Sequence, residues 1–252
     1  MIGVFDSGVG GLSVFREIRR LLPEQSYIYF SDNAHCPYGE KSCEYIIERA
    51  REISSFLISK GAEIIVVACN TATAAAIGAL RERYPDTIII GIEPALKTGA
   101  DKYPGGHIGV MATPVTLEGE KFQRLLERFS GRCRVSLISA PGLADLVEAG
   151  KQNGPEGETL LRGLLEPYRG KLDALVLGCT HYPFARETIQ KVLGRETELL
   201  DGGEGTAAQT MHLLQERGLL YEGPGQVVFQ NSLKDDRMLE LSRQLYGEAD
   251  NG

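Results

Sequence analysis

Two cysteines stand in matching surroundings, Cys69 within VVACNT (66–71) and Cys179 within VLGCTH (176–181). A thiol with an ordinary pKa of about 8.5 can hold or release a proton near neutral pH. Two thiols on opposite faces of one carbon could remove a proton from one face and return a proton to the other, which inverts that stereocentre. A single free cysteine is more often a buried apolar residue, so this hypothesis rests on the recurrence of the pair.

Each thiol has a titratable neighbour that is expected to assist it. Asp6 directly follows the first predicted strand and is placed to orient or deprotonate Cys69. His181 lies two residues after Cys179, so in an extended backbone the two side chains would point to the same side and could exchange a proton. Backbone N–H groups at helix starts would bind the substrate carboxylates, together with polar side chains of Ser7, Asn70, Thr71, Thr113 and Thr180.

The elements that position these residues follow from the hydrophobic pattern. Short runs rich in Ile and Val alternate with segments that place apolar residues at helical spacing. The strands predicted in the first half are 2–5, 27–30, 63–69 and 87–92. The same order recurs at a nearly constant offset in 107–113, 134–140, 173–181 and 197–203.

This alternation is typical of mainly parallel sheets flanked by helices. Because ligands bind beyond the carboxyl ends of such strands, both cysteines stand at the expected edge. The sequence therefore predicts an α/β protein of two similar domains, related by a pseudo-twofold axis, with the active site in the cleft between them.

The domain limits are predicted from composition. The join lies in KTGADKYPGG (97–106), which is rich in Gly, Pro and charged residues. After the second unit, a helix (206–218), a strand (226–232) and a last helix (233–247) are expected to return to the first domain. We therefore predict a first domain of residues 1–97 and 207–252, and a second domain of residues 98–206.

The glycine-rich loop at 8–13 supports an alternative. It follows a predicted strand and precedes a helix, as a dinucleotide-binding loop does, and Asp32 ends the second strand, where a ribose-binding acid would stand. Ser13 occupies the place of the third glycine, however, and a tight turn presenting Asp6 and Ser7 explains the glycines equally well. A nicotinamide-dependent enzyme therefore stays an open hypothesis.

Composition narrows the class of protein. The chain is 42% hydrophobic and 24% charged, with a net charge of -7 and no basic run that would indicate nucleic-acid binding. No apolar stretch approaches the length of a membrane span, and no secretory leader is visible, so we expect a cytoplasmic protein. An odd number of cysteines without a C-x-x-C pair predicts neither a disulfide framework nor a metal site; we interpret Cys36, Cys43 and Cys133 as structural.

The sequence resembles the glutamate racemases of the cofactor-independent aspartate/glutamate racemase superfamily. The matching segments span nearly the whole chain in the family's order: GVFDSGVGGLSV (3–14), CPYGEKS (36–42), VACNTATA (67–74), ATPVT (112–116), LVEAG (146–150) and LGCTHYP (177–183). The resemblance implies interconversion of L- and D-glutamate without a cofactor, supplying D-glutamate for peptidoglycan. It implies glutamate as the small-molecule partner and no nucleic-acid or membrane partner, and it makes a homodimer one of the expected assemblies.

The resemblance also assigns roles to residues. Cys69 would take the proton from D-glutamate and Cys179 from L-glutamate, with Asp6 and His181 assisting. Motif positions that hold substrate fall on Asp6, Ser7, Tyr38, Gly39, Asn70, Thr71, Thr180 and His181, and Thr113 and Thr116 are expected to join them. Glu148 falls on an acidic position near the second thiol, and Asp32 is kept as an auxiliary candidate.

Two positions depart from the family pattern. An arginine is usual two residues before Pro-Tyr-Gly, where His35-Cys36 precede Pro37 in this chain, and a serine is common where Gly202 stands. The aspartate-specific relatives share the paired cysteines, so an aspartate or other amino-acid racemase is the second hypothesis. A non-catalytic two-domain ligand-binding protein is a further alternative.

Overall fold

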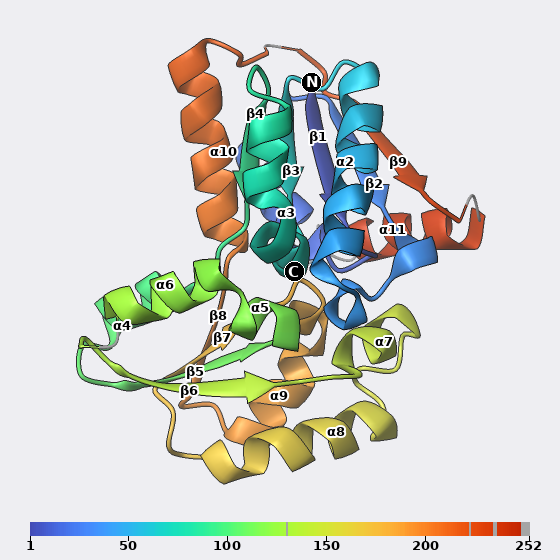
Figure 1. Ribbon diagram of the computed structural model, residues 1–252. Helices are drawn as coiled ribbons and strands as arrows, with labels where there is room; N and C mark the ends of the chain where they lie inside the picture. Colours follow the sequence, from blue (N-terminus) through green and yellow to red (C-terminus); the bar gives the residue numbers. More distant parts are fainter. Residues whose placement is uncertain (130, 222, 234–235, 248–252) are drawn as a thin grey trace.

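The computed structural model describes residues 1–129, 131–221, 223–233 and 236–247. Its strands form two parallel sheets, one above the other in Figure 1. The first sheet has the order β4-β3-β1-β2-β9, with β1 Ile2–Asp6, β2 Tyr27–Ser31, β3 Ile64–Val67, β4 Ile88–Gly91 and β9 Val227–Asn231. The second has the order β6-β5-β7-β8, with β5 His107–Ala112, β6 Arg134–Ser139, β7 Ala174–Leu177 and β8 Glu198–Asp201.

The strand order repeats between the sheets, as the duplicated sequence pattern predicts. The order β2-β1-β3-β4 matches the order β6-β5-β7-β8, and every pairing is parallel. In the first sheet the chain therefore passes from β1 to β2 on one side, and then from β3 to β4 on the other side. In the second sheet it passes in the same way from β5 to β6, and then from β7 to β8. Open α/β sheets bind ligands at such a switch point, beyond the carboxyl ends of the two central strands. Cys69 follows β3 at one switch point and Cys179 follows β7 at the other.

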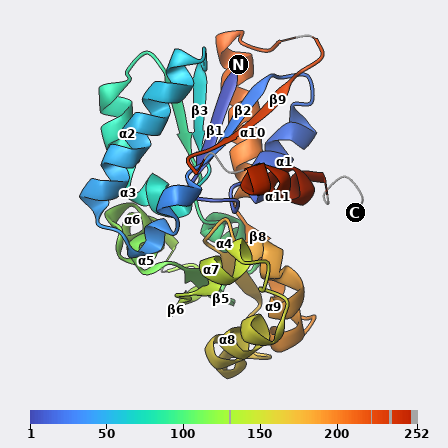
Figure 2. The ribbon, with the colours of Figure 1, turned by 90° about the vertical axis from the view of Figure 1, so that its right-hand side faces the viewer.

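Helices cover both faces of each sheet (Figures 1 and 2). In the first domain, one face packs against α1 Leu12–Leu21, α10 Gly203–Arg217 and α11 Asp236–Gly247, and the other against α2 Cys43–Ser59 and α3 Asn70–Arg83. In the second, the faces pack against α4 Leu96–Lys102, α5 Pro114–Glu118 and α6 Glu120–Phe129, and against α7 Leu143–Glu148, α8 Pro155–Leu165 and α9 Arg186–Leu193. Short 3₁₀ turns lie at Asn33–His35, Tyr38–Glu40, Glu166–Tyr168 and Tyr182–Ala185.

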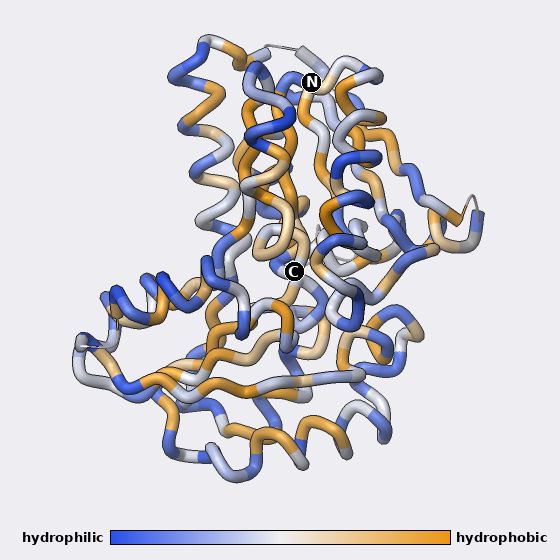
Figure 3. The backbone as a smooth tube through the Cα atoms, in the orientation of Figure 1, coloured by the Kyte–Doolittle hydropathy of each residue, from blue (hydrophilic) through white to orange (hydrophobic). Residues whose placement is uncertain are grey.

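Burial on both faces explains the unbroken apolar runs of the central strands. All four residues of β3 are buried, as are all four of β7; a strand covered by helices on both sides has no polar face. Figure 3 shows hydrophobic residues along the sheets and hydrophilic residues on the outward turns of the helices. Gly61 has a φ of 91° just after α2; glycine adopts this left-handed conformation without strain.

The C-terminal segment returns to the first sheet, because β9 pairs with β2 from Tyr27↔Val227 to Ser31↔Asn231. The predicted domain limits, 97/98 and 206/207, fall inside α4 and α10, the two helices that connect the sheets. We retain these limits as a proposal. No helix within the described ranges is long and apolar enough to cross a membrane.

Candidate active site

Cys69 lies where β3 gives way to α3. It is the N-cap residue of α3, and its Sγ accepts a hydrogen bond from the N–H of Ala72 at 3.4 Å. The thiol donates toward Oγ of Ser7 at 3.7 Å. Burial raises the pKa of the Cys69 thiol, the charges of Asp6 and Cys179 raise it further, and the Ala72 N–H lowers it only in part. The thiol is therefore held protonated, beside a helix N-terminus that can stabilise a thiolate once a base removes the proton.

Cys179 follows β7 in the second domain and is also buried. Its Sγ lies 3.7 Å from Nδ1 of His181. The sequence prediction assumed an extended backbone between these two residues, and that assumption is wrong. The N–H of Tyr182 donates to the Cys179 carbonyl, and His181 has helical dihedral angles, φ −75° and ψ −30°. The two side chains thus meet through a turn. The charge of Cys179 contributes to the raised pKa of Cys69.

His181 is buried among groups that favour its charged form. Its Nε2 lies 2.7 Å from Oε1 of Glu148, the last residue of α7. Burial would lower the pKa of His181, but hydrogen bonds with Cys179, Cys36 and Glu148 outweigh burial and raise it well above its ordinary value. For Glu148, burial raises the pKa, but the contacts with His181 and with the N–H of Val9 lower it overall. The pair is therefore an imidazolium ion beside a carboxylate.

Asp6, at the end of β1, connects the two halves of the site. Its Oδ2 accepts from the N–H of Gly8 at 3.0 Å, and its Oδ1 accepts from the hydroxyl of Thr180 in the second domain at 3.1 Å. Burial raises the pKa of Asp6, and the charge of His181 and the surrounding donors offset this only partly. A carboxylate with a raised pKa accepts a proton more readily than an exposed one, which suits a base that serves Cys69.

The predicted substrate-binding residues meet across the domains. Oγ1 of Thr71 lies 3.0 Å from Oγ1 of Thr113, which also caps α5 by accepting from the N–H of Thr116 at 3.3 Å. Gly39 packs on the same threonine, because a Cβ there would lie 3.0 Å from Cγ2 of Thr113. Oδ1 of Asn70 is buried and has no hydrogen-bond partner within the described residues. A buried acceptor left unpaired costs about 1–3 kcal/mol, and a substrate ammonium group would satisfy it.

Asp32 is occupied by a network that the sequence did not reveal. Arg49 of α2 donates from Nε to Oδ2 at 3.0 Å and from Nη2 to Oδ1 at 2.8 Å. The hydroxyl of Tyr38 donates to Oδ2 at 2.5 Å. Both carboxylate oxygens are thus engaged in holding the loop that contains Tyr38 and Gly39. This arrangement disfavours Asp32 as a ribose ligand, and nothing in the sequence around Arg49 distinguishes it from a surface residue of a helix.

The glycines of the loop at 8–13 are explained by close approach of the site residues. A Cβ added at Gly8, Gly10 or Gly11 would overlap with side-chain atoms of Glu148, His181 and Asp6, respectively. The loop therefore needs glycine so that these three side chains can lie against its backbone. This packing explains the glycines without a bound dinucleotide.

The two departures from the family pattern have local consequences. At Gly202, a Cβ would overlap the backbone oxygen of Glu93, so a serine does not fit this backbone. His35 hydrogen-bonds to Tyr45, whereas Cys36 is a hydrogen-bond partner of His181. Cys36, which the sequence led us to interpret as structural, thus contacts the acid/base machinery. A contact between segments so distant in sequence leaves no spacing pattern.

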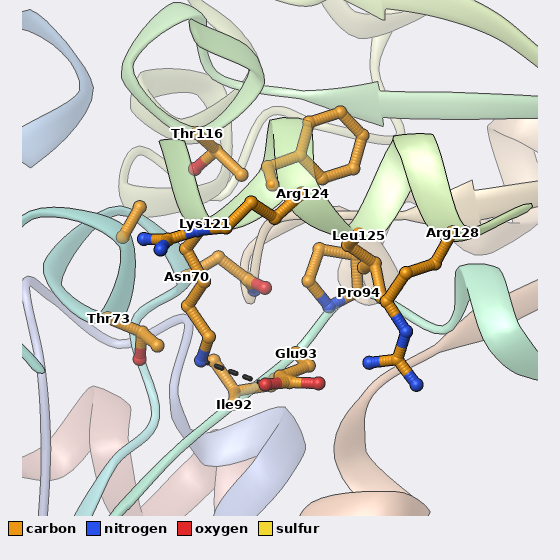
Figure 4. A pocket seen from close by; sticks show the side chains of 12 residues that line it. Asn70, Thr73, Ile92, Glu93, Pro94, Thr116, Lys121, Arg124, Leu125 and Arg128 are labelled. Carbon is orange, nitrogen blue, oxygen red and sulfur yellow. Dashed lines mark ion pairs between the residues drawn. The ribbon is translucent and has the colours of Figure 1, made fainter. Parts of the chain in front are cut away.

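A pocket lies at the domain junction between α3 and α6 (Figure 4). Two of the predicted site residues, Asn70 and Thr116, line it. Three basic side chains of α6 also line it, Lys121, Arg124 and Arg128, against one carboxylate, Glu93, which pairs with Lys121 at 3.0 Å. Neither Cys69 nor Cys179 lines this pocket, so its excess of positive charge would draw an anionic substrate to the domain junction rather than hold it at the thiols.

Several known proteins resemble this chain in sequence and in fold. The sequence model of the Asp/Glu/Hydantoin racemase family matches residues 2–210. The glutamate racemase of Stutzerimonas stutzeri is 47% identical over 248 residues, 98% of this chain and 94% of that protein. The structure of a glutamate racemase isoform from Bacillus anthracis has a TM-score of 0.89 at 33% identity, over 98% of this chain and 94% of that one. The structure of Escherichia coli glutamate racemase, in complex with L-glutamate and the activator UDP-MurNAc-ala, has a TM-score of 0.84 at 34% identity, over 97% of this chain and 94% of that one.

Proposed function

The chain belongs to the Asp/Glu/hydantoin racemase family, and from that premise we propose that it interconverts L-glutamate and D-glutamate by proton transfer at the α-carbon, without an organic cofactor. The observation that most supports this function is the position of two buried thiols after equivalent strands of two sheets with the same strand order. Sγ of Cys179 lies 3.7 Å from Nδ1 of His181, and the charge of Asp6 acts on the thiol of Cys69. The high identity to proteins named glutamate racemase supports glutamate over aspartate.

In the direction from L-glutamate, the Cys179 thiolate takes the α-proton and the Cys69 thiol delivers its own proton to the opposite face. The reverse direction exchanges the two roles. The imidazolium of His181 stabilises the Cys179 thiolate. Asp6 is the group available to take the Cys69 proton when that thiol must act as the base. Each turnover removes one proton and adds another, so the thiols end in swapped protonation states, which solvent then resets.

The carbanion formed between these steps must be stabilised. The substrate carboxylate would accept hydrogen bonds from N–H groups at the start of α3 and from the hydroxyls of Ser7, Thr71 and Thr180. Asn70 would accept from the substrate ammonium through its unpaired Oδ1. Because these groups are buried, their effect on developing charge is stronger than it would be in water.

Circular dichroism of a glutamate solution tests this function, because inversion removes the optical signal of either enantiomer. We expect Cys69→Ser and Cys179→Ser to lower kcat/KM by at least about 100-fold, the usual minimum for loss of a general acid or base. Cys43→Ser is the matched control, since Cys43 is an exposed thiol on α2, and it should keep full activity. Unchanged activity in either active-site variant would overturn the mechanism.

The same protein distinguishes the alternatives. Faster inversion of aspartate than of glutamate would favour the aspartate hypothesis. Glutamate binding without α-hydrogen exchange would favour a ligand-binding protein. Saturable NAD binding that depends on Asp32 would favour the nicotinamide enzyme, although Arg49 and Tyr38 already engage that carboxylate.

We further propose that the enzyme acts in the cytoplasm, supplies D-glutamate for peptidoglycan and forms a homodimer. The family relationship supports all three. Rescue of a bacterial strain that requires external D-glutamate would test the cellular role, and light scattering after size-exclusion chromatography would test the assembly.

A further inference from the structure

We propose that Cys36, Glu148 and His181 form a binding site for a borderline divalent metal ion such as Zn²⁺, and that an ion bound there inhibits proton transfer at Cys179. The inhibitory effect rests on the proposed racemase function, whereas the metal site itself does not.

The three side chains converge from distant parts of the chain. Cys36 follows the turn after β2 in the first domain, Glu148 ends α7, and His181 follows β7 in the second domain. One ligand atom from each, a sulfur, an oxygen and a nitrogen, lies within 4.8 Å of the other two. The sequence predicted no metal site because it contains no C-x-x-C pair, and the residues of this cluster lie too far apart in the chain to form a spacing pattern.

The geometry suits a small tetrahedral ion. Zn²⁺ binds sulfur at about 2.3 Å, nitrogen at about 2.0–2.1 Å and carboxylate oxygen at about 2.0–2.2 Å, which places tetrahedral ligands roughly 3.3–3.7 Å apart. The present separation of His181 Nε2 and Glu148 Oε1, 2.7 Å, therefore has to open by about 0.6–1.0 Å, and the Cys36 sulfur, now within 4.8 Å of both atoms, has to come into the same range. Gly8 makes room beside the cluster, because any side chain there would overlap Glu148 and press on Cys36.

The donor set is chemically selective. A thiolate, an imidazole and a carboxylate together match Zn²⁺ and similar ions, and they disfavour Mg²⁺ and Ca²⁺, which prefer oxygen ligands alone. Three protein ligands leave a fourth position for water, as in open zinc sites. Glu148 is already oriented by the N–H of Val9 at 2.8 Å and the amide of Asn33 at 3.1 Å, and such outer contacts strengthen metal binding.

The site is accessible from solvent, because Cys36 and Glu148 are only partly buried while His181 is enclosed. On binding, Cys36 releases its thiol proton and His181 releases its Nε2 proton to solvent, so that His181 coordinates through Nε2 as a neutral imidazole with its remaining proton on Nδ1. Since Nδ1 is the atom that faces Cys179 Sγ at 3.7 Å, a bound metal fixes that ring and places its own positive charge near the sulfur, which stabilises the Cys179 thiolate and makes it a weaker base.

The test uses the full chain, freed of metal with a chelator. Isothermal titration with Zn²⁺ should show one tight site, and a Co²⁺-loaded sample should show thiolate-to-metal absorption. Cys36→Ser, or Cys36→Ala if the serine variant does not fold, should weaken Zn²⁺ binding by at least about 10-fold, since even outer contacts of a metal site are worth that much. Cys43→Ser should bind Zn²⁺ like the unmodified chain.

Racemisation of glutamate is measured in the same samples, each compared with its own metal-free rate. Zn²⁺ should inhibit the unmodified enzyme reversibly, with recovery on adding EDTA, and the Cys36 variants should resist inhibition by a similar factor. Equal Zn²⁺ affinity in the Cys36 variants would mean that the ion binds elsewhere and would overturn the site, as would no binding at all. Binding without inhibition would overturn the inhibitory effect. A metal-free enzyme without racemase activity would refute the proposed function, and the titration would still decide whether the site exists.

Discussion

Glu148→Gln removes one negative charge from the site and leaves the size of the side chain almost unchanged. Oε1 of Glu148 faces Nε2 of His181 at 2.7 Å and accepts from the N–H of Val9 at 2.8 Å. The amide oxygen of glutamine can still accept from Val9. Asn33, whose own Oδ1 has no partner within the described residues, can rotate its amide to accept from the new NH₂ group. The fold should therefore tolerate the change, and the main loss is the carboxylate beside the imidazolium.

The size of the effect follows from that loss. A hydrogen bond to a charged group contributes about 1.5–3 kcal/mol, which corresponds to a fall of about 10- to 150-fold in kcat/KM if the contact supports the transition state. The fall in kcat/KM should be the same in both directions. The two enantiomers of glutamate have equal free energies, so the equilibrium constant between them is about 1, and it equals the ratio of the two kcat/KM values. Glu156→Gln removes an exposed carboxylate that pairs with Lys151, and it should change kcat/KM less than about twofold.

The pH dependence gives the sign of the effect. The Glu148 carboxylate helps raise the pKa of His181, so removing it lowers that pKa, and the imidazolium is lost at a lower pH. The alkaline limb of the kcat/KM profile should therefore move to lower pH in Glu148→Gln. The ion pair also stabilises the fold only above the lowered pKa of Glu148 and below the raised pKa of His181. Denaturation curves of the two proteins should thus converge at acidic and alkaline extremes.

The assay is circular dichroism at fixed ionic strength across pH, with a thermal melt on each protein. A melting temperature like that of the unmodified chain, together with unchanged kcat/KM and an unchanged alkaline limb, would refute the role of Glu148 in supporting His181.

Three further predictions concern neighbouring contacts. Gly10→Ala should destabilise the fold by about 1–3 kcal/mol and abolish most activity, because the new Cβ overlaps His181. Gly78 lies in open space within α3, so Gly78→Ala should instead stabilise the fold by about 0.5–1 kcal/mol. Urea denaturation of the two variants measures both changes. Thr180→Val removes a donor to buried Asp6 and should cost about 1–3 kcal/mol of unfolding free energy, a loss that denaturation at neutral pH would reveal and that an unchanged midpoint would contradict. The double variant Arg124→Glu and Arg128→Glu, which reverses two charges at the pocket, should lower kcat/KM mostly at low ionic strength, because salt screens the attraction between the pocket and the substrate anion. A loss of kcat/KM that did not depend on salt would contradict steering by charge.

The sequence predicted the parts of the fold that depend on local pattern. Short apolar runs ending in Asp, Cys or Thr fix both where strands end and which residues reach the sheet edge, because the ends of parallel strands coincide. Cys69 and Cys179 were chosen as candidates for that reason, and the repeated order of the runs predicted two sheets of the same topology. The C-terminal strand was expected to return to the first domain, and its pairing with β2 is consistent with that expectation.

Contacts between distant segments were beyond the sequence. Arg49 looks like any basic residue on an exposed helix, yet it occupies the carboxylate of Asp32. Cys36 looked structural because it has no partner nearby in the sequence, and only folding brings it to His181. The glycines of the loop at 8–13 fitted two interpretations, and the side chains packed against them, which come partly from the second domain, distinguish one from the other.

Hydrogen isotope content after a brief reaction in heavy water tests the two-thiol mechanism most directly. With L-glutamate as substrate, product and remaining substrate are separated early and their α-positions are analysed by mass spectrometry. If one thiol removes the proton and another delivers a solvent-derived one, the D-glutamate formed should contain deuterium while the recovered L-glutamate keeps its original hydrogen, and the same should hold from D-glutamate. Product that retains the substrate's own hydrogen would mean that a single group serves both faces, and the two-thiol mechanism would be wrong.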